Sequence, residues 1–332
     1  MKQDSASKDT DLLALIDTIS QRRRLAPKAG ADQCATDDIT PQTKRIRRVN
    51  DITDAGAAIA TAAPVGDEMV FCHSALCQVG LPRSKVDGRE FMRRSGNAWL
   101  NVQAGYLDEG AGPILQPVPY GPTPRLAMLW VSTYARRHST REIYIGKNPS
   151  QFLQMLGMDT QGYRYKKLRE QMHALAACRL QIGYLGRTYN GQPIEQFDAW
   201  ISRRGADVAP LWPGTLVLSQ SFYDELMEFG VPLDGRAIQQ LSGSSIALDI
   251  YAWLAHRLHR IDGRPILLHW KSLRQQFGHE YHGPNAHVNF RDPFLNGLRL
   301  SLAVYPKANV KVVHGGLRLS ASPPPVPFKG AA

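Results

Sequence analysis

Cysteine, long apolar runs and nucleotide-binding loops are scarce or missing in this sequence of 332 residues. The cysteines at 34, 72, 77 and 178 are too few and too scattered for a disulfide framework. Cys72, His73 and Cys77 have the spacing C-H-x3-C, and no second cysteine pair follows at zinc-finger distance. We therefore expect idle thiols, with no metal and no other cofactor. The motif G-x-x-x-x-G-K-[ST] does not occur, which argues against ATP hydrolysis at a P-loop.

No stretch approaches 18 consecutive apolar residues, so the sequence predicts no transmembrane helix and no membrane partner. The first residues, MKQDSASKDTD, contain no apolar segment of the kind that a secretory signal needs. We expect a cytoplasmic protein.

Acidic residues are the minority, with 29 Asp and Glu against 40 Lys and Arg, and the net charge is +11. The excess is localised. Residues 136–206 carry 12 basic and 5 acidic side chains, whereas residues 1–66 and 67–135 are nearly balanced and residues 207–332 carry 12 and 9. Concentrated positive charge of this kind is typical of nucleic-acid binding.

The most basic region contains the pattern of a helix-turn-helix. We predict a short helix over 150–156, a stop at Gly157 and a second helix over 164–178. The second helix has an apolar stripe with helical spacing, formed by Tyr165, Leu168, Met172 and Leu175. Its other side is basic and amide-bearing. A solvated helix face is the alternative for this pattern.

The flanking segments predict a winged helix around this pair. A helix over 123–138 and a strand over 141–147 come before it, and two strands over 179–185 and 195–202 follow as the wing, with Asn190-Gly191 as their turn. Upstream, Ser95-Gly96-Asn97 predicts a further hairpin within 91–104.

A second series of elements follows the same order. It comprises a strand over 215–218, a helix over 220–229, a long helix capped by Ser244, a strand over 264–270, a helix over 271–278, a helix starting at Asp292-Pro293 and ending at Val304, and a hairpin over 310–320. We therefore predict an α+β protein with two tandem winged-helix domains, 67–208 and 209–328. Residues 1–66 are predicted to be an arm, with a short amphipathic helix followed by a basic and largely disordered linker.

Several strings in this region resemble the plasmid-encoded RepA-type replication initiators. They are FCHSALCQVGLPRSKV, PRLAMLWVSTYA, SLRQQFG, FRDPFLNGL and LRLSASPPPV, and the resemblance covers about residues 67–328. It implies a bacterial, plasmid-associated protein that binds repeated origin sequences in double-stranded DNA and recruits host helicase or initiator proteins. It also implies that both domains can contact DNA and that the first can form a dimer.

Arg, Lys, Asn and Gln on the second helix of each pair are the natural readers of base edges, and basic wings fix the register on phosphates. The candidate DNA-binding residues are Tyr163, Arg164, Lys166, Lys167, Gln171, Arg187, Arg203, Arg204, Asn289, Arg291, Asn296, Arg299 and Lys311. A surface ion pair or simple solvation is the alternative for each of them.

Two other functions remain open at this stage. A transcriptional repressor would use the same winged helices. An origin-nicking enzyme would need a nucleophilic Tyr near metal-binding His residues, and His279-Glu280-Tyr281-His282 is the nearest such group. No partner cluster accompanies it, so we expect a binding protein and not an enzyme.

Overall fold

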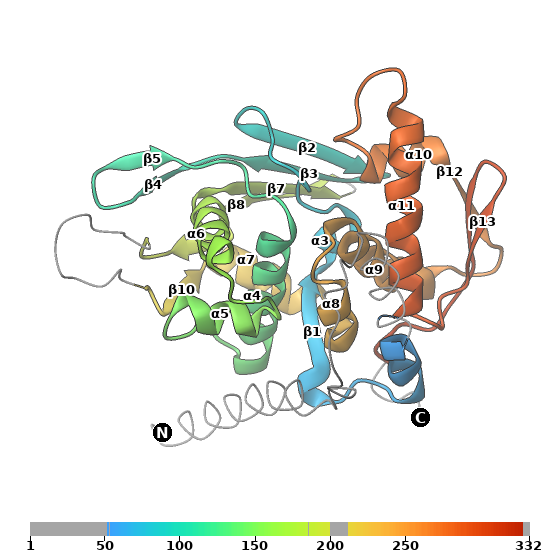
Figure 1. The fold of residues 1–332 in the computed structure, drawn as a ribbon, viewed down its shortest axis with the longest axis horizontal. Coiled ribbons are helices and arrows are strands. Elements are labelled where there is room, and N and C mark those ends of the chain that lie inside the picture. Colours follow the sequence, from blue (N-terminus) through green and yellow to red (C-terminus); the bar gives the residue numbers. More distant parts are fainter. Residues whose placement is uncertain (1–51, 53, 185, 200–211, 328–332) are drawn as a thin grey trace, which may run out of the picture. The chain divides into compact units, whose positions relative to one another are not determined.

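The computed structural model describes residues 52, 54–184, 186–199 and 212–327, and it has mixed α and β structure, as predicted (Figure 1). Its helices are α3 Ser74–Gln78, α4 Pro122–His138, α5 Pro149–Met155, α6 Gly162–Ala177, α7 Gln220–Phe229, α8 Gly235–Leu241, α9 Ser245–Arg257, α10 Trp270–Phe277 and α11 Ala286–Ala303. Residues 54–61 are also helical, and two short 3-10 helices are present, η1 Gly66–Glu68 and η2 Leu258–Arg260.

The strands form five small antiparallel sheets. The strands are β1 Met69–His73, β2 Glu90–Ser95, β3 Ala98–Gln103, β4 Tyr106–Asp108, β5 Pro113–Leu115, β6 Glu142–Tyr144, β7 Arg179–Tyr184, β8 Arg187–Gly191, β9 Ile194–Gln196, β10 Thr215–Leu218, β11 Gly230–Asp234, β12 Ile266–His269, β13 Val310–Val313 and β14 Gly316–Leu319. The hairpin of β2 and β3 turns at Gly96 and Asn97, as predicted.

Two parts of the chain repeat one arrangement. In the first repeat, residues 122–218, the order is α4, β6, α5, α6, β7, β8, β9 and β10. Strands β7 and β8 belong to another sheet, and the remaining three strands have the sheet order β6-β10-β9. In the second repeat, residues 245–319, the order is α9, β12, α10, α11, β13 and β14, and the sheet order is β12-β14-β13. In both, the strand after the first helix pairs with the last strand, which lies in the middle of the sheet.

The predicted strand at 215–218 exists, but its predicted place was wrong. We expected it to open the second domain, whereas β10 is the central strand of the first sheet and pairs with β6 and β9. Leu216 and Leu218 are buried, so burying both side chains against the first repeat fixes the strand there.

The hairpin after α6 was also assigned to the wrong partner. It is formed by β7 and β8, with Gly186 (φ 86°) at its turn instead of Asn190-Gly191, and β7 pairs with β3 in a sheet of order β2-β3-β7-β8. Leu180 and Ile182 share a buried face with residues of β2 and β3. Because these side chains are buried together with those of β2 and β3, the hairpin belongs to that sheet and not to the sheet of the first repeat.

One helix begins earlier than its sequence signals indicate, and one was not predicted. α11 starts at Ala286, and Pro293, which we expected at its first turn, lies inside it. Residues 54–61 are helical, within the segment expected to be disordered. Ile52 is buried and Ile59 packs against the core, which gives this alanine-rich segment the tertiary contacts that a short helix needs. The amphipathic helix expected in the arm lies outside the described residues.

A buried cluster of charges joins the segment before the first repeat, the first repeat and the second repeat. Arg125 of α4 binds Asp249 of α9 through two hydrogen bonds of 2.6 and 2.7 Å. Arg93 of β2 lies 2.9 Å from Glu280 and 4.0 Å from Asp249, and its side chain is 0 % exposed. Arg83 lies 2.6 Å from Glu280. We call these three arginines and two carboxylates the charge cluster.

The environment of the charge cluster determines the charge states of its members. Burial lowers the pKa of Arg93 to about 10, although both carboxylates oppose the change. For Glu280, burial raises the pKa, but the charges of Arg93 and Arg83 outweigh it and hold the pKa at about 2. Glu280 is therefore an ion-pair partner of two arginines, which makes it unsuitable as the general acid of a nicking site.

We expect Asp249→Asn to destabilise the fold by about 3–5 kcal/mol, because it leaves buried arginines without their counter-charge. Glu195→Gln is the matched control. It breaks the exposed Arg141–Glu195 pair of 2.8 Å and should cost less than about 1 kcal/mol. Urea unfolding followed by circular dichroism measures both, and equal effects would contradict a special role for the cluster.

The low pKa of Glu280 predicts a loss of stability in acid. Because the folded-state pKa of about 2 lies below the ordinary value of 4.5, the stabilisation is complete above pH 4.5 and is lost as the pH falls towards 2. Glu280→Gln should flatten this part of the curve of unfolding free energy against pH. An unchanged slope between pH 4.5 and 2 would contradict the prediction.

Candidate nucleic-acid interface

The exposed side of α6 carries cations that are mostly paired within the chain. Arg164 lies 3.1 Å from Asp159, Lys167 lies 3.5 Å from Glu170, and Arg169 lies 3.1 Å from Glu109. Lys167 also lies 3.7 Å from the centre of the Tyr120 ring. The exposed Lys166 has no ion pair among the described residues, and Tyr163, which is 59 % exposed, has the Arg164 guanidinium 4.8 Å from the centre of its ring.

Gln171 does not belong to the exposed side of α6, and its prediction as a base reader was wrong. It is 0 % exposed, its Oε1 accepts a hydrogen bond of 2.7 Å from the Tyr120 backbone N–H, and its Nε2 donates to Glu170. Two residues on, His173 is also buried and contacts Glu109 at 3.2 Å. Only the first turns of α6 are therefore open to a ligand.

Arg187 lies on the β7–β8 hairpin and is not an unpaired wing cation. Its guanidinium lies 2.5 Å from Glu225 and over the ring of Phe229, 5.2 Å from its centre. This ion pair joins the hairpin to α7 and reduces the charge available for a phosphate. Arg203 and Arg204, which we also predicted to contact DNA, lie outside the described residues.

Along α11, in contrast, three of the predicted residues are exposed. Asn289, Arg291 and Arg299 face solvent, and Asn296 is partly buried. The Arg291 guanidinium lies over the Trp270 ring, 4.9 Å from its centre, an arrangement that leaves its charge unneutralised. The opposite face of α11 is buried and holds Phe290, Phe294, Gly297, Leu298 and Ser301. The helix therefore presents one polar face along its length.

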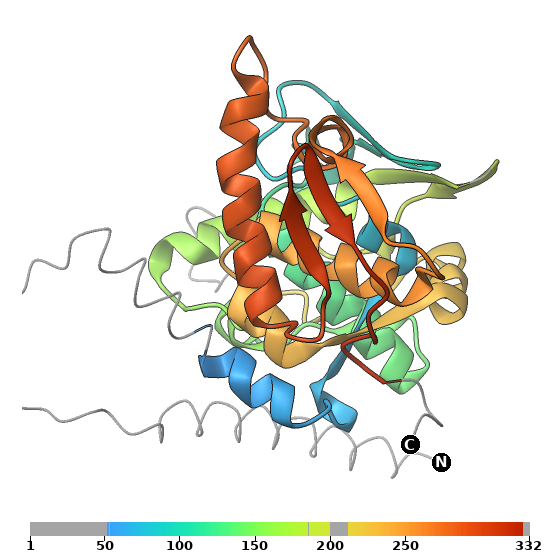
Figure 2. The same cartoon turned by 90° about the vertical axis from the view of Figure 1, so that its right-hand side faces the viewer.

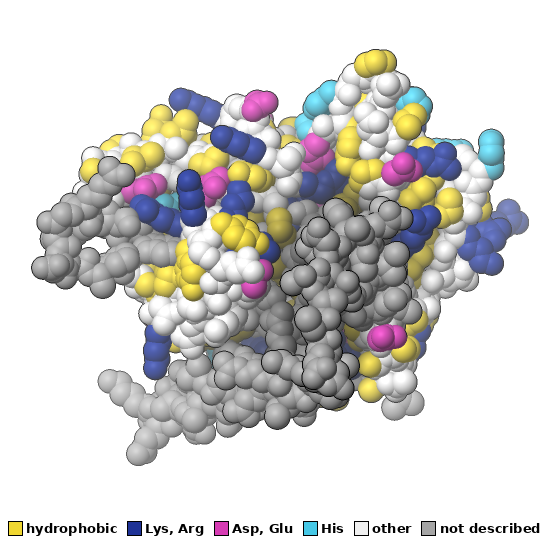
Figure 3. All heavy atoms as spheres, viewed as in Figure 1, with side chains coloured by type: hydrophobic (Ala, Val, Ile, Leu, Met, Phe, Trp, Pro, Cys, Tyr) yellow, Lys and Arg dark blue, Asp and Glu magenta, His cyan; other side chains and the backbone are white. Residues whose placement is uncertain are grey.

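The β13–β14 hairpin adds two cations to the second repeat. Lys311 and Arg318 are direct cross-strand partners, and both are exposed. Arg318 was missed from the sequence, although the alternation of Leu317, Arg318 and Leu319 indicates that Arg318 points away from the core. Figure 3 shows Lys and Arg side chains where β13 lies.

The two repeats differ in how their cations are compensated. The α6 cations Arg164, Lys167 and Arg169 each form an ion pair with a carboxylate. In the second repeat, no ion pair among the described residues involves Arg291, Arg299, Lys311 or Arg318. Unpaired cations keep their full charge for phosphates. The second repeat consequently has more unpaired positive charge than the first, although the first lies in the more basic part of the sequence.

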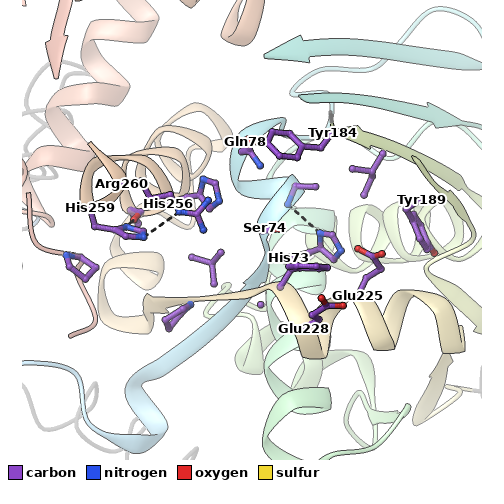
Figure 4. Close-up of a pocket in the computed structure, with 18 of the residues that line it drawn as sticks. His73, Ser74, Gln78, Tyr184, Tyr189, Glu225, Glu228, His256, His259 and Arg260 are labelled. Carbon is purple, nitrogen blue, oxygen red and sulfur yellow. Dashed lines mark hydrogen bonds between the residues drawn. The ribbon is translucent and has the colours of Figure 1, made fainter. Parts of the chain in front are cut away.

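A cavity of about 610 Å³ lies between β1, β7, β8, α7 and η2 (Figure 4). It is lined by His73, which is 3 % exposed, and by His256, which is 5 % exposed. The Nε2 atom of each has no hydrogen-bond partner among the described residues. Burial lowers the pKa of both to about 4, with the nearby Arg260, His259 and Arg257 adding to the effect at His256, so both rings are neutral near pH 7.

Neither this cavity nor any other part of the described chain contains three clustered His, Cys, Asp or Glu side chains placed to hold a metal ion. Likewise, no helix among the described residues is long and apolar enough to cross a membrane.

The lowered pKa of the buried His73 predicts that the stability of the fold depends on pH. The folded-state pKa of His73 is about 4 and its ordinary value is 6.5, so stability contributed by the neutral ring is present above pH 6.5 and is lost as the pH falls to 4. The size is on the order of 3 kcal/mol. His73→Asn keeps an acceptor for the Ala75 N–H and removes the titration. A variant with the wild-type slope between pH 6.5 and 4 would contradict this assignment.

Comparisons with known proteins bear on the first repeat and on the start of the second. Residues 118–270 match the family model described as plasmid encoded RepA protein. A comparison with curated proteins finds no match.

Among solved structures, the chain is similar to domains 2–3 of RctB. One of these structures has 12% identity and a TM-score of 0.42, and the match covers 72% of this chain and 85% of that one. A selenomethionine structure of the same two domains has 13% identity and a TM-score of 0.42, and the match covers 64% and 79%. Over residues 118–270, the resemblance to the plasmid-encoded RepA proteins is thus confirmed by the family model.

Proposed function

We propose that this protein is a plasmid replication initiator that binds repeated duplex sequences at an origin through two winged-helix domains. The observation that carries the proposal is the repeated arrangement itself. A helix, a strand, two helices and two final strands recur in 122–218 and 245–319 with the same strand order in each three-stranded sheet, and the first repeat has the β7–β8 hairpin inserted before its final two strands. This is the order of a winged helix, in which the second helix of the pair enters the major groove.

On this proposal, the second repeat supplies most of the base contacts. Asn289, Asn296 and Arg299 occupy the polar face of α11, and amide and guanidinium groups can pair with adenine and guanine edges. Lys311 and Arg318 are proposed to bind phosphates beside the groove. In the first repeat, Tyr163 and Lys166 are the open side chains, and Arg164 and Lys167 would have to exchange a carboxylate for a phosphate.

The resemblance to RepA proteins extends the proposal to partners. These are a second copy of the chain and host helicase or initiator proteins, and the activity is binding without catalysis. A transcriptional repressor would bind duplex DNA in the same way, so replication itself has to be measured. A circle that carries the gene and its flanking repeats should replicate in a bacterium, and failure to replicate with normal duplex binding would favour the repressor.

We expect Arg299→Ala to weaken specific duplex binding about 5- to 150-fold, the range for one bidentate base contact. Arg89→Ala, which removes an exposed cation of the loop before β2, is the matched control and should have little effect. A mobility-shift assay with the plasmid's own repeats and with scrambled duplexes measures both. Equal binding of the two duplexes by wild type at physiological salt would overturn the proposal.

Lys311→Gln together with Arg318→Gln should act differently. Because phosphate contacts carry no sequence information, both specific and scrambled duplexes should lose affinity to a similar extent. The dependence of log Kobs on log salt should become less steep by about 0.9 for each lost contact. A loss of specificity without a change in the salt dependence would contradict the assignment of these two residues to phosphates.

A further inference from the structure

The sheet of β2, β3, β7 and β8 has one buried face and one open face. Phe91, Arg93, Leu100, Leu180 and Ile182 lie on the buried face. The open face carries the alternate residues, which are Glu90, Met92, Arg94, Trp99, Asn101, Gln103, Arg179, Gln181, Gly183, Thr188 and Asn190. Most of these are exposed or partly exposed. Figure 1 shows this sheet along the top of the view, with helices below it.

Trp99 packs directly against the main chain of the neighbouring strand. Its cross-strand partner on β7 is Gly183, where a Cβ atom would lie 1.9 Å from Nε1 and 2.0 Å from Cε2 of the indole. One side of the ring is therefore seated on backbone that only glycine permits. Among the described residues, no aromatic ring or cation stacks on the indole, and its N–H has no hydrogen-bond partner.

One cation lies directly beside this ring, and amides and a second cation follow along the sheet. Arg94 is the direct partner of Trp99 on β2, it is exposed, and no ion pair among the described residues involves it. Two residues along the sheet, Asn101 donates to Gln181 at 3.1 Å and to Glu90 at 2.8 Å. Beyond them, Arg179 is exposed and donates to Asn190 at 2.8 Å. Asn101 itself is 4 % exposed, so the open face combines an aromatic ring, the partly exposed amides of Gln103 and Gln181, the carboxylate of Glu90 and a positive charge at two positions.

We propose that this open face binds single-stranded DNA, with a base stacked on Trp99 and phosphates contacted by Arg94 and Arg179. Proteins bind unpaired bases by stacking them on aromatic rings of an open antiparallel sheet, while flanking cations contact the phosphates. A duplex does not fit this chemistry, because its bases are already stacked on one another. The site is separate from α6, α11 and the β13–β14 hairpin, and it does not rest on the proposed reading of duplex repeats.

Trp99 also covers Gly183, so a purely structural role has to be separated from binding. Trp99→Phe keeps a ring on the glycine, whereas Trp99→Leu keeps apolar cover without an aromatic surface. Thermal unfolding of both variants tests whether the sheet is intact. Arg94→Gln provides a second route, because an exposed side chain without an ion pair among the described residues is not needed for folding.

Binding of fluorescein-labelled oligo(dT) to the full chain, measured by anisotropy, tests the proposal. We expect Trp99→Leu to weaken binding about 5- to 100-fold, Trp99→Phe to retain most of the affinity and Arg94→Gln to weaken binding and its salt dependence. Binding of the duplex repeats should not change in these variants. Arg299→Ala should leave oligo(dT) binding unchanged.

Two outcomes would overturn the inference. One is wild-type protein that binds the duplex but not oligo(dT) at the same salt concentration. The other is oligo(dT) binding that stays at the wild-type level in both Trp99→Leu and Arg94→Gln while the variants remain folded.

Discussion

The buried charge cluster is the constraint on which the arrangement of the described chain depends. Arg125 binds Asp249 and also donates to the backbone carbonyls of Leu81, Pro82 and Gly121, so one guanidinium joins the two repeats and the segment before them. Glu280 forms ion pairs with Arg83 and Arg93, so both arginines belong to this junction. Charges buried in this way are tolerated only in their paired geometry. The cluster therefore fixes a single spatial relation between α4 and α9.

Around this junction, the two repeats use one arrangement with different electrostatics. In the first, acidic residues stand beside the cations of α6, and Gln171 has become part of the core. In the second, the polar face of α11 and the β13–β14 hairpin carry cations that are free of ion pairs within the described residues. The exposed surfaces of the two repeats therefore differ in how much of their positive charge is left unpaired.

The sequence predicted which helices and strands exist better than it predicted which strands pair. Helices α4, α5, α6, α7, α9 and α10 follow from apolar periodicity and caps, which are local properties. The pairing of β10 with β6, and of β7 with β3, depends on burial across long sequence separations and could not be derived from local patterns. The same holds for the pair of Arg187 with Glu225, whereas the partners of Arg164 and Lys167 are only five and three residues away, and a surface ion pair was the alternative expected for each. The exposure of Arg299, in contrast, could be predicted from helical periodicity.

Pro293 has an effect on α11 beyond the shift of its predicted start. Without an N–H, it cannot donate to the carbonyl of Asn289, so one rung of the helical hydrogen-bond ladder is missing in the middle of the polar face. The turns that hold Asn289 and Arg291 are joined less stiffly to those that hold Asn296 and Arg299. A helix bends most easily at such a position, and the Asn289 carbonyl is left without its usual donor four residues on.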